Sequence, residues 1–248
     1  MSDLKPSKDL EKTIRIVDRI FGRLRIPYWL SFGGLWGIVK NNGVVPDGDL
    51  DYCIHYGADW KKVVALFERC GWTKSKVMLN DTNLDQAVYF GFNRKGFPHM
   101  CVSCWWLHDG IRYYCHDQNR DLRQGTIGVP KSGYYFKGVP AEYVDGEHCL
   151  KKVEWPGISG IAKVSVPVRT GMLDYMYPCW GYKKQRYVPF DYKVNEGKMV
   201  SIWKGGATSP YMVHVRSMAE WNDKTGIKRQ LERSMLKWNA KLKEMRNK

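Results

Sequence analysis

The sequence predicts an α+β fold in which helices pack on a mixed β-sheet. An amphipathic segment at the start of the chain predicts a long helix, and the segments after it alternate between helical and strand-like patterns. The middle of the chain is rich in strand-like segments, which completes the pattern of a mixed sheet with flanking helices. Hydrophobic residues make up 44% of the 248 residues, so the chain can bury the core that such a fold needs.

The first expected helix begins after Ser7, which is a favourable N-cap and is followed by acidic residues in the first turn. Its apolar face repeats at steps of three and four residues and consists of Leu10, Ile14, Val17, Phe21 and Leu24. We then expect a strand over residues 26–32, a break at Gly33-Gly34 and a short helix over residues 35–41.

The next strand, over residues 50–55, alternates in chemistry. One face carries Asp49, Asp51 and Cys53, and the other carries Leu50, Tyr52 and Ile54. A helix is expected from its cap Asp59 to Cys70, where Gly71 ends it. Strands are expected after it over residues 72–78, 87–92, 100–106 and 111–115, and weaker hairpins around residues 133–136 and 161–168.

The last segment predicts a basic C-terminal helix. Its apolar stripe consists of Ile227, Leu231, Met235, Trp238, Leu242 and Met245. Residues 224–248 contain nine Lys or Arg and two Glu, so their net charge is 9 − 2 = +7. The basic side of this helix is either a solvated surface or a surface that faces phosphates. We expect a core over residues 1–120 and an extension over residues 121–248 that carries acceptor-side loops and this helix.

The charge of the whole chain, +15, favours anionic partners such as nucleic acid, anionic lipid, glycans or nucleotides. A basic enzyme that binds only phosphate would have the same composition. The first residues lack an apolar signal core, and no segment reaches the roughly 20 apolar residues of a membrane span. We therefore expect a cytoplasmic protein in which the seven cysteines are thiols. Cys101 and Cys104 would point to opposite faces of a strand, so we do not expect them to share a zinc ion.

Residues 28–55 combine two features that suit phosphate chemistry. A Gly33-Gly34 turn at a helix N-terminus exposes backbone N–H groups to a phosphate, and glycine allows a close approach. Asp49 and Asp51 lie two apart on a strand, so both can bind Mg²⁺ or Mn²⁺, with Asp47 as an auxiliary. Nucleotidyl transfer needs both features, because the phosphate charge must be neutralised and the reacting oxygens held in line.

This order of motifs resembles the signature of polymerase-beta-type nucleotidyltransferases. The run over residues 32–54 is similar, more specifically, to the LicD/fukutin family. The matching residues are Gly33, Gly34, Leu35 and Gly37, then Pro46, Asp47, Asp49 and Asp51, with Lys40 in place of an arginine. A weaker match covers Val166-Pro167, Leu173 and residues 175–181. The resemblance implies a nucleotidyltransferase fold and the metal-dependent transfer of phosphocholine, polyol phosphate or a related group from a CDP-type donor to a glycan.

The sequence departs from the family pattern on a later strand. Many members carry a third metal-binding acid there, and Ser103 stands where that acid is expected. Asp109 or Asp117 could replace it, or two aspartates could suffice. The departure leaves the second metal open and also allows glycosyl transfer, in which the metal only holds the diphosphate leaving group.

Other residues are weaker candidates. Lys40 could contact the diphosphate together with Gly33 and Gly34. Lys183, Lys184 and Arg186 alternate with aromatic residues, a pattern that suits a polyanionic or sugar acceptor and also a basic surface hairpin. His116 is a candidate general base or acceptor contact, or a structural histidine.

The function expected from these observations is a metal-dependent transferase. It would take a sugar, polyol phosphate or phosphocholine-type group from a nucleotide-diphosphate-activated donor and pass it to a polymeric, anionic acceptor such as a surface glycan. One alternative is a glycosyltransferase that modifies DNA or RNA with a nucleotide sugar. A second alternative is a catalytically inactive nucleotidyltransferase fold that binds nucleic acid. The oligomeric state is left open.

Overall fold

The computed structural model describes residues 3–45, 48–80, 82–118, 134–158, 162–176, 211–215, 217–221, 223, 228–229, 231–233, 235–236 and 239–240. The chain forms two compact units. The first comprises Met1–Leu107 and Ala141–Thr170, and the second comprises His108–Pro140 and Gly171–Lys248. Each unit is described separately below.

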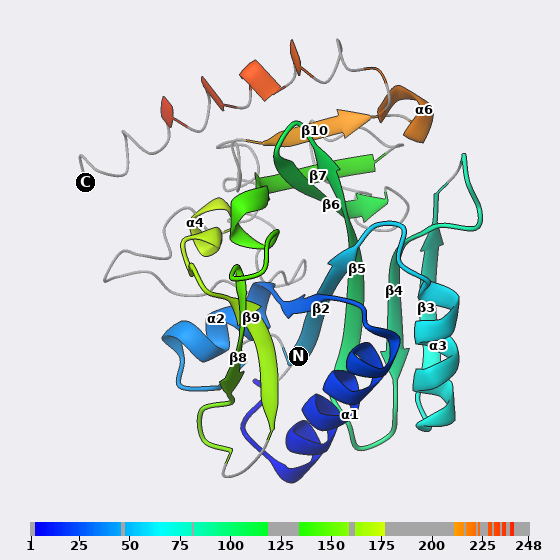
Figure 1. Cartoon of the computed structure of the whole chain (residues 1–248), viewed down its shortest axis with the longest axis vertical. Coiled ribbons are helices and arrows are strands. Elements are labelled where there is room, and N and C mark those ends of the chain that lie inside the picture. Colours follow the sequence, from blue (N-terminus) through cyan, green and yellow to red (C-terminus); the bar gives the residue numbers. More distant parts are fainter. Residues whose placement is uncertain are drawn as a thin grey trace. The chain divides into compact units, whose positions relative to one another are not determined.

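The first unit is built on a five-stranded sheet (Figure 1). Its strands lie in the order β1 (Tyr28–Leu30), β2 (Asp49–His55), β5 (His99–His108), β4 (Ala87–Asn93) and β3 (Thr73–Leu79). Strands β2 and β5 are parallel, and the other neighbours in this order are antiparallel. This mixed sheet with flanking helices confirms the expected α+β fold.

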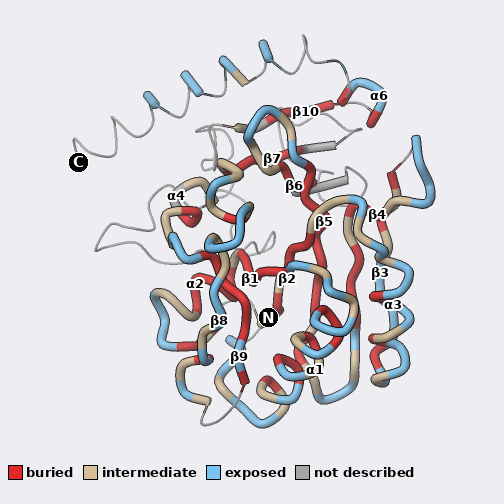
Figure 2. The backbone as a smooth tube through the Cα atoms, viewed as in Figure 1, coloured by how far each residue is buried: buried red, intermediate tan, exposed pale blue. Residues whose placement is uncertain are grey.

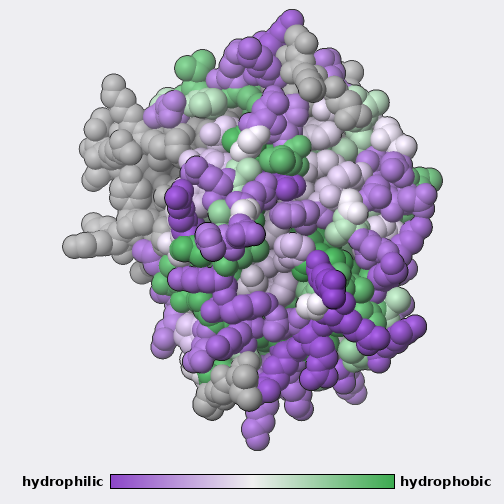
Figure 3. Space-filling view, viewed as in Figure 1, coloured by the Kyte–Doolittle hydropathy of each residue, from purple (hydrophilic) through white to green (hydrophobic). Residues whose placement is uncertain are grey.

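Helices α1 (Lys8–Leu24) and α3 (Trp60–Arg69) begin where the sequence predicts, because each has a side-chain cap. The hydroxyl of Ser7 accepts a hydrogen bond from the Leu10 amide at 3.1 Å, and the Asp59 carboxylate accepts one from the Lys62 amide at 3.1 Å. Both helices bury one apolar face, and the inner side of α1 is red in Figure 2. The outer side of α1 is basic, and the surface over it is mainly hydrophilic in Figure 3.

Both helices cover the same face of the sheet. The Phe21 ring of α1 stacks on Tyr28 with 4.7 Å between ring centroids, and Tyr28 contacts the ring of Tyr52 on β2. The Phe67 ring of α3 lies 4.4 Å from that of Phe92 on β4. Because side chains alternate along a strand, the helices cover the face that carries Leu50, Tyr52 and Ile54. The face that carries Asp49 and Asp51 is the opposite one.

Helix α2 (Phe32–Lys40) connects β1 to β2 and starts three residues earlier than expected. Gly33 and Gly34 do not break the chain; they lie inside the first turn of this helix. Ser31 is in an extended conformation, and Phe32 turns the chain with a φ of 46°. A left-handed φ is uncommon for a phenylalanine, and such residues cluster at functional sites.

A two-stranded hairpin of β8 (Leu150–Glu154) and β9 (Lys163–Pro167) completes the first unit, and β9 packs beside β1. The expected hairpin around residues 161–168 is therefore the second strand of a wider hairpin. Lys152 of β8 bonds to the Asp18 carboxylate and donates to the Tyr28 hydroxyl at 2.9 Å. The short 3₁₀ helix η1 (Ala141–Tyr143) precedes this hairpin.

The second unit contains β6 (Ile111–Gln118), β7 (Tyr134–Pro140) and β10 (Met212–Val215), which pair antiparallel in that order. Helices α4 (Met172–Met176) and α6 (Met218–Trp221) accompany them. The Trp221 ring stacks on Phe136 with 4.0 Å between centroids. The described positions among residues 228–240 are helical, and the rest of the expected C-terminal helix lies outside the described residues. Among the described residues, no helix has the length and apolarity needed to cross a membrane.

Candidate active site

The two aspartates of the sequence motif lie where the alternation of β2 predicts. Asp49 and Asp51 are both partly exposed, whereas Leu50 and Tyr52 between and beside them are fully buried. The aspartates therefore share the sheet face that α1 and α3 leave uncovered. Farther along the same face, buried Trp29 and Trp105 pack edge to face with ring centroids 5.3 Å apart. On the face that carries Asp49 and Asp51, the polar side chains therefore lie at the start of β2 and the buried aromatic ones lie farther along.

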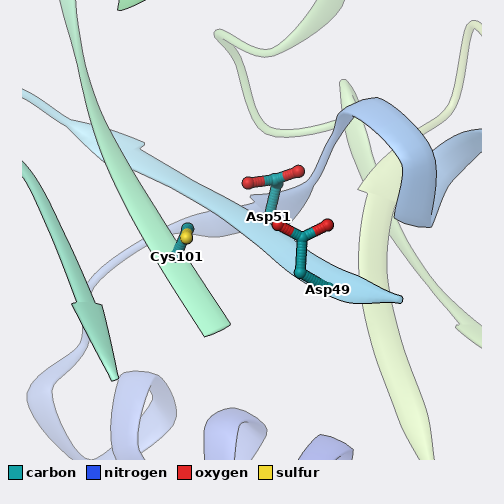
Figure 4. A group of neighbouring side chains, drawn as sticks. All are labelled: Asp49, Asp51 and Cys101. Atoms are coloured by element: carbon teal, nitrogen blue, oxygen red, sulfur yellow. The ribbon is translucent and has the colours of Figure 1, made fainter. Parts of the chain in front are cut away.

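Cys101 joins the two aspartates (Figure 4). In the parallel pairing of β2 with β5, Cys101 is the register partner of Asp51, and His99 is the partner of Asp49. One carboxylate oxygen from each aspartate and the Cys101 sulfur all lie within 4.8 Å of one another. Two carboxylates and a thiol so close together are a donor set that fits a divalent metal ion.

The Cys101 sulfur is held by two further side chains. The Tyr89 hydroxyl of β4 donates a hydrogen bond to it, and the His99 Nε2 atom lies 3.2 Å from it. The His99 Nδ1 atom in turn lies 2.6 Å from the Asn93 side-chain oxygen, which orients the ring. Burial, followed by the charge of Asp51, raises the pKa of the Cys101 thiol, and burial lowers the pKa of His99.

The N-terminal turn of α2 is attached directly to the aspartate strand. The Ser31 amide donates to the backbone oxygen of Asp51 at 2.9 Å. The Ser31 hydroxyl bonds with the Cys53 thiol and does not cap the helix. Among the hydrogen bonds of the described residues, the amides of Gly33 and Gly34 are not donors. Such amides at the positive end of a helix dipole suit a phosphate oxygen.

Two glycines of α2 are required by packing. A Cβ atom on Gly34 would lie 2.8 Å from Cδ1 of buried Leu30, and one on Gly37 would lie 2.9 Å from the backbone oxygen of Val44.

The loop that leads from α2 toward β2 is also fixed by Trp155, whose buried indole N–H donates to the Gly43 oxygen at 2.8 Å. These contacts set the position from which the chain enters β2.

The structure brings together four of the predicted site residues, Gly33, Gly34, Asp49 and Asp51, through α2 and β2. It does not place Lys40 with them, because Lys40 is exposed at the other end of α2, about 9 Å along the helix axis from Gly34. Asp47, Lys183, Lys184 and Arg186 lie outside the described residues. His116 belongs to β6 of the second unit, and its side chain also lies outside the described part.

The structure places Cys101, and not Ser103, beside Asp51 on the later strand. Ser103, expected there from the sequence, pairs with Cys53 and Tyr89 and is buried two residues away from the aspartates. Cys101 occupies the position beside Asp51. Sequence reasoning missed Cys101, Tyr89 and His99 as site residues, because only the register between strands shows which residue of β5 stands next to Asp51.

The comparisons with known proteins give remote likenesses. No protein-family model matches the sequence, and no curated protein matches it significantly. Among solved structures, the chain is similar to the lincosamide antibiotic adenylyltransferase LnuA bound to lincomycin, with 16% identity over 64% of this chain and 82% of that one. It is also similar to the antibiotic-resistance factor ANT(2'')-Ia in solution (13% identity, 79% and 85% covered) and in complex with adenylyl-2''-tobramycin (17% identity, 79% and 89% covered). The TM-score is 0.35 in each case, and likeness at this level assigns no substrate to the chain.

Proposed function

We propose that this protein is a metal-dependent transferase that takes a group from a nucleotide-activated donor. The observation that carries the proposal is the hydrogen bond from Ser31 to Asp51, which fixes the uncapped first turn of α2 beside the carboxylates of β2. A phosphate-binding helix terminus and a pair of metal-binding carboxylates are the two parts that transfer from a nucleoside diphosphate or triphosphate requires.

Each part has a defined role in the proposal. Asp49 and Asp51 hold Mg²⁺ or Mn²⁺, and Asp47 assists them. The bound ion supplies charge neutralisation at the phosphates. The amides of Gly33 and Gly34 hold a diphosphate oxygen, whereas Lys40, exposed at the other end of α2, is not assigned to it.

The transferred group is proposed to be a sugar, a polyol phosphate or phosphocholine, as the motif resemblance to the LicD/fukutin family implies. The acceptor is proposed to be an anionic polymer such as a surface glycan, because a net charge of +15 attracts polyanions. The extension over residues 121–248 would supply acceptor contacts through Lys183, Lys184 and Arg186, and His116 of β6 is a further candidate.

A thermal-shift experiment tests the proposal. The protein is screened with nucleoside triphosphates, nucleotide sugars and CDP-linked donors, with and without Mg²⁺ or Mn²⁺, beside an Asp49→Asn/Asp51→Asn variant. A ligand present at 100 times its Kd stabilises the native protein by about 2.7 kcal/mol. We expect a metal-dependent shift with one donor class that is lost in the double variant and kept in Asp85→Asn, whose carboxylate is exposed on another part of the first unit.

Two results would contradict the proposal. The first is that no nucleotide shifts the melting temperature. The second is a nucleotide shift that is independent of metal and unchanged in the Asp49→Asn/Asp51→Asn variant, which would favour a catalytically inactive binding module.

The charge of the chain supports one second candidate, a glycosyltransferase that acts on DNA or RNA. Binding to nucleic acid releases counterions, so its affinity must fall steeply as salt rises. A fluorescence anisotropy titration with a short DNA duplex at two salt concentrations measures this dependence. Affinity that hardly changes between them would remove the nucleic-acid acceptor from consideration.

A further inference from the structure

We infer that Cys101 is a direct metal ligand and that the site therefore selects a thiophilic divalent ion of the zinc class over Mg²⁺. The inference rests on the proposed function, since it specifies the ion of the same site. It differs from an all-carboxylate site in one atom, the Cys101 sulfur, whose proton passes to the solvent when the sulfur bonds to the ion.

The first argument is geometric. Asp51 and Cys101 are register partners on two parallel strands, so their side chains leave the sheet on the same face. The sulfur and one oxygen of each aspartate lie within 4.8 Å of one another, so an ion can contact all three after small side-chain rotations. In Figure 4 the Cys101 side chain stands beside the two carboxylates on that face.

The second argument is that the surroundings of Cys101 orient its sulfur. Tyr89 and His99 both contact the sulfur, and Asn93 holds the other nitrogen of the His99 ring. Polar partners that hold a ligand in a fixed orientation are the usual second layer of a metal site.

Among the described residues, the other two cysteines of this sheet region, Cys53 and Cys104, do not join the carboxylate pair. Cys104 is on the same strand but three residues away, so it points to the other face, and burial raises its pKa. Cys53 shares the face of Asp51, yet it is fully buried, and its thiol bonds with the Ser31 hydroxyl inside the core. Cys104 therefore serves as a matched control for Cys101.

The third argument is chemical. Mg²⁺ and Ca²⁺ take oxygen ligands almost exclusively, whereas thiolate ligands favour Zn²⁺ and related ions. A site in which sulfur replaces the third carboxylate oxygen should therefore bind Mg²⁺ more weakly relative to Zn²⁺, Co²⁺ and Cd²⁺.

Absorption spectroscopy and metal titration test the inference in the full chain. With Co²⁺ or Cd²⁺, we expect a sulfur-to-metal charge-transfer band in the wild type and in Cys104→Ser, and no such band in Cys101→Ser. We also expect Cys101→Ser to lower the affinity for Zn²⁺ at least about tenfold and to change the affinity for Mg²⁺ less. Cys101→Asp, which restores an oxygen ligand, should shift the preference back toward Mg²⁺ and provides a second variant if the serine variant does not fold.

The outcomes separate this inference from the proposed function. A wild type that shows a metal-dependent nucleotide shift but no charge-transfer band, or a band that persists in Cys101→Ser and Cys101→Asp, overturns the inference and leaves the proposed function standing. A charge-transfer band that depends on Cys101 without any nucleotide shift supports the inferred metal site and contradicts the transferase. If the wild type melts cooperatively but shows neither a charge-transfer band nor a nucleotide shift, both the inferred metal site and the proposed function are overturned.

Discussion

At Gly34 the structure predicts that one added methyl group will destabilise the protein. A Cβ atom there would lie 2.8, 2.9 and 3.1 Å from three carbon atoms of the Leu30 side chain, which is fully buried. Real Cβ atoms do not approach other atoms so closely, so either Leu30 or the start of α2 must shift. In Gly22 of α1, by contrast, an added Cβ would meet nothing within 4 Å.

The expected magnitudes follow from two opposing effects. Overpacking a buried site costs about 1–3 kcal/mol, and replacing glycine by alanine in a helix gains up to about 1 kcal/mol. Gly34→Ala should therefore lower the free energy of unfolding by about 1 kcal/mol. Gly22→Ala should raise it by about 0.4–1 kcal/mol, because only the helix term operates there. The two variants should differ by about 2 kcal/mol, which is roughly 4–8 °C in Tm for a chain of this length.

Urea unfolding followed by circular dichroism and by tryptophan fluorescence measures both variants against the wild type. Gly22→Ala is the matched control, since it makes the same chemical change in a helix of the same unit. If Gly34→Ala proves as stable as Gly22→Ala, then α2 does not lie against Leu30 as described, and the reasoning fails.

Three further predictions concern the elements that frame the site. Asp59→Ala should lower the free energy of unfolding by about 1 kcal/mol at neutral pH through loss of the α3 cap, and Asp59→Asn should lower it much less. The hydrogen bonds with Lys62 lower the pKa of Asp59, so the advantage of the wild type over Asp59→Ala should disappear as the pH falls through that lowered pKa. Urea midpoints measured at several pH values test this. Trp155→Phe should lower the free energy of unfolding by about 1–3 kcal/mol, because it leaves the buried Gly43 oxygen without its hydrogen-bond donor. Calorimetry measures this change, and unchanged stability would contradict the prediction. Lys152→Met should cost less than about 1 kcal/mol, because its pair with Asp18 is more than 40% exposed on each side; a larger loss in urea titrations would contradict this.

The helices and strands of the first unit could largely be predicted because their signals are local. The cap of α1 at Ser7 and that of α3 at Asp59 are single residues with one preferred role. Gly71 ends the α3 region with a φ of 85°, a conformation that glycine adopts without strain. The alternation of β2 likewise predicts correctly that Leu50, Tyr52 and Ile54 enter the core and that Asp49 and Asp51 lie on the opposite face. It does not predict that Cys53, farther along that opposite face, is fully buried.

The start of α2 could not be predicted from such signals, and the expected break at Gly33-Gly34 is wrong. Glycine is a poor helix former, so local propensity favours a turn there. The structure includes both residues in the helix because tertiary packing outweighs propensity: Gly34 lies against Leu30, and Gly37 lies against the Val44 carbonyl. A sequence alone does not show these approaches.

The third residue of the site could not be predicted for a different reason. Cys101 and Ser103 lie on the same face of β5, so alternation treats them alike. The parallel register pairs Asp51 with Cys101 rather than Ser103, and register depends on contacts between segments that are 50 residues apart in the sequence. A two-residue shift in register would therefore exchange the sulfur beside the carboxylates for a hydroxyl.

The position of α1 shows why net charge alone does not locate an acceptor. The outer face of α1 carries exposed cations at Lys8, Lys12, Arg15, Arg19 and Arg23. The Phe21–Tyr28 and Tyr28–Tyr52 ring contacts place this helix on the sheet face opposite Asp51. Part of the charge excess that attracts polyanions thus lies behind the site, where it can raise the encounter rate of an anionic polymer but cannot hold a hydroxyl at the donor. In the proposed transferase, an acceptor that reacts beside the aspartates would therefore have to be bound by residues on the carboxylate face.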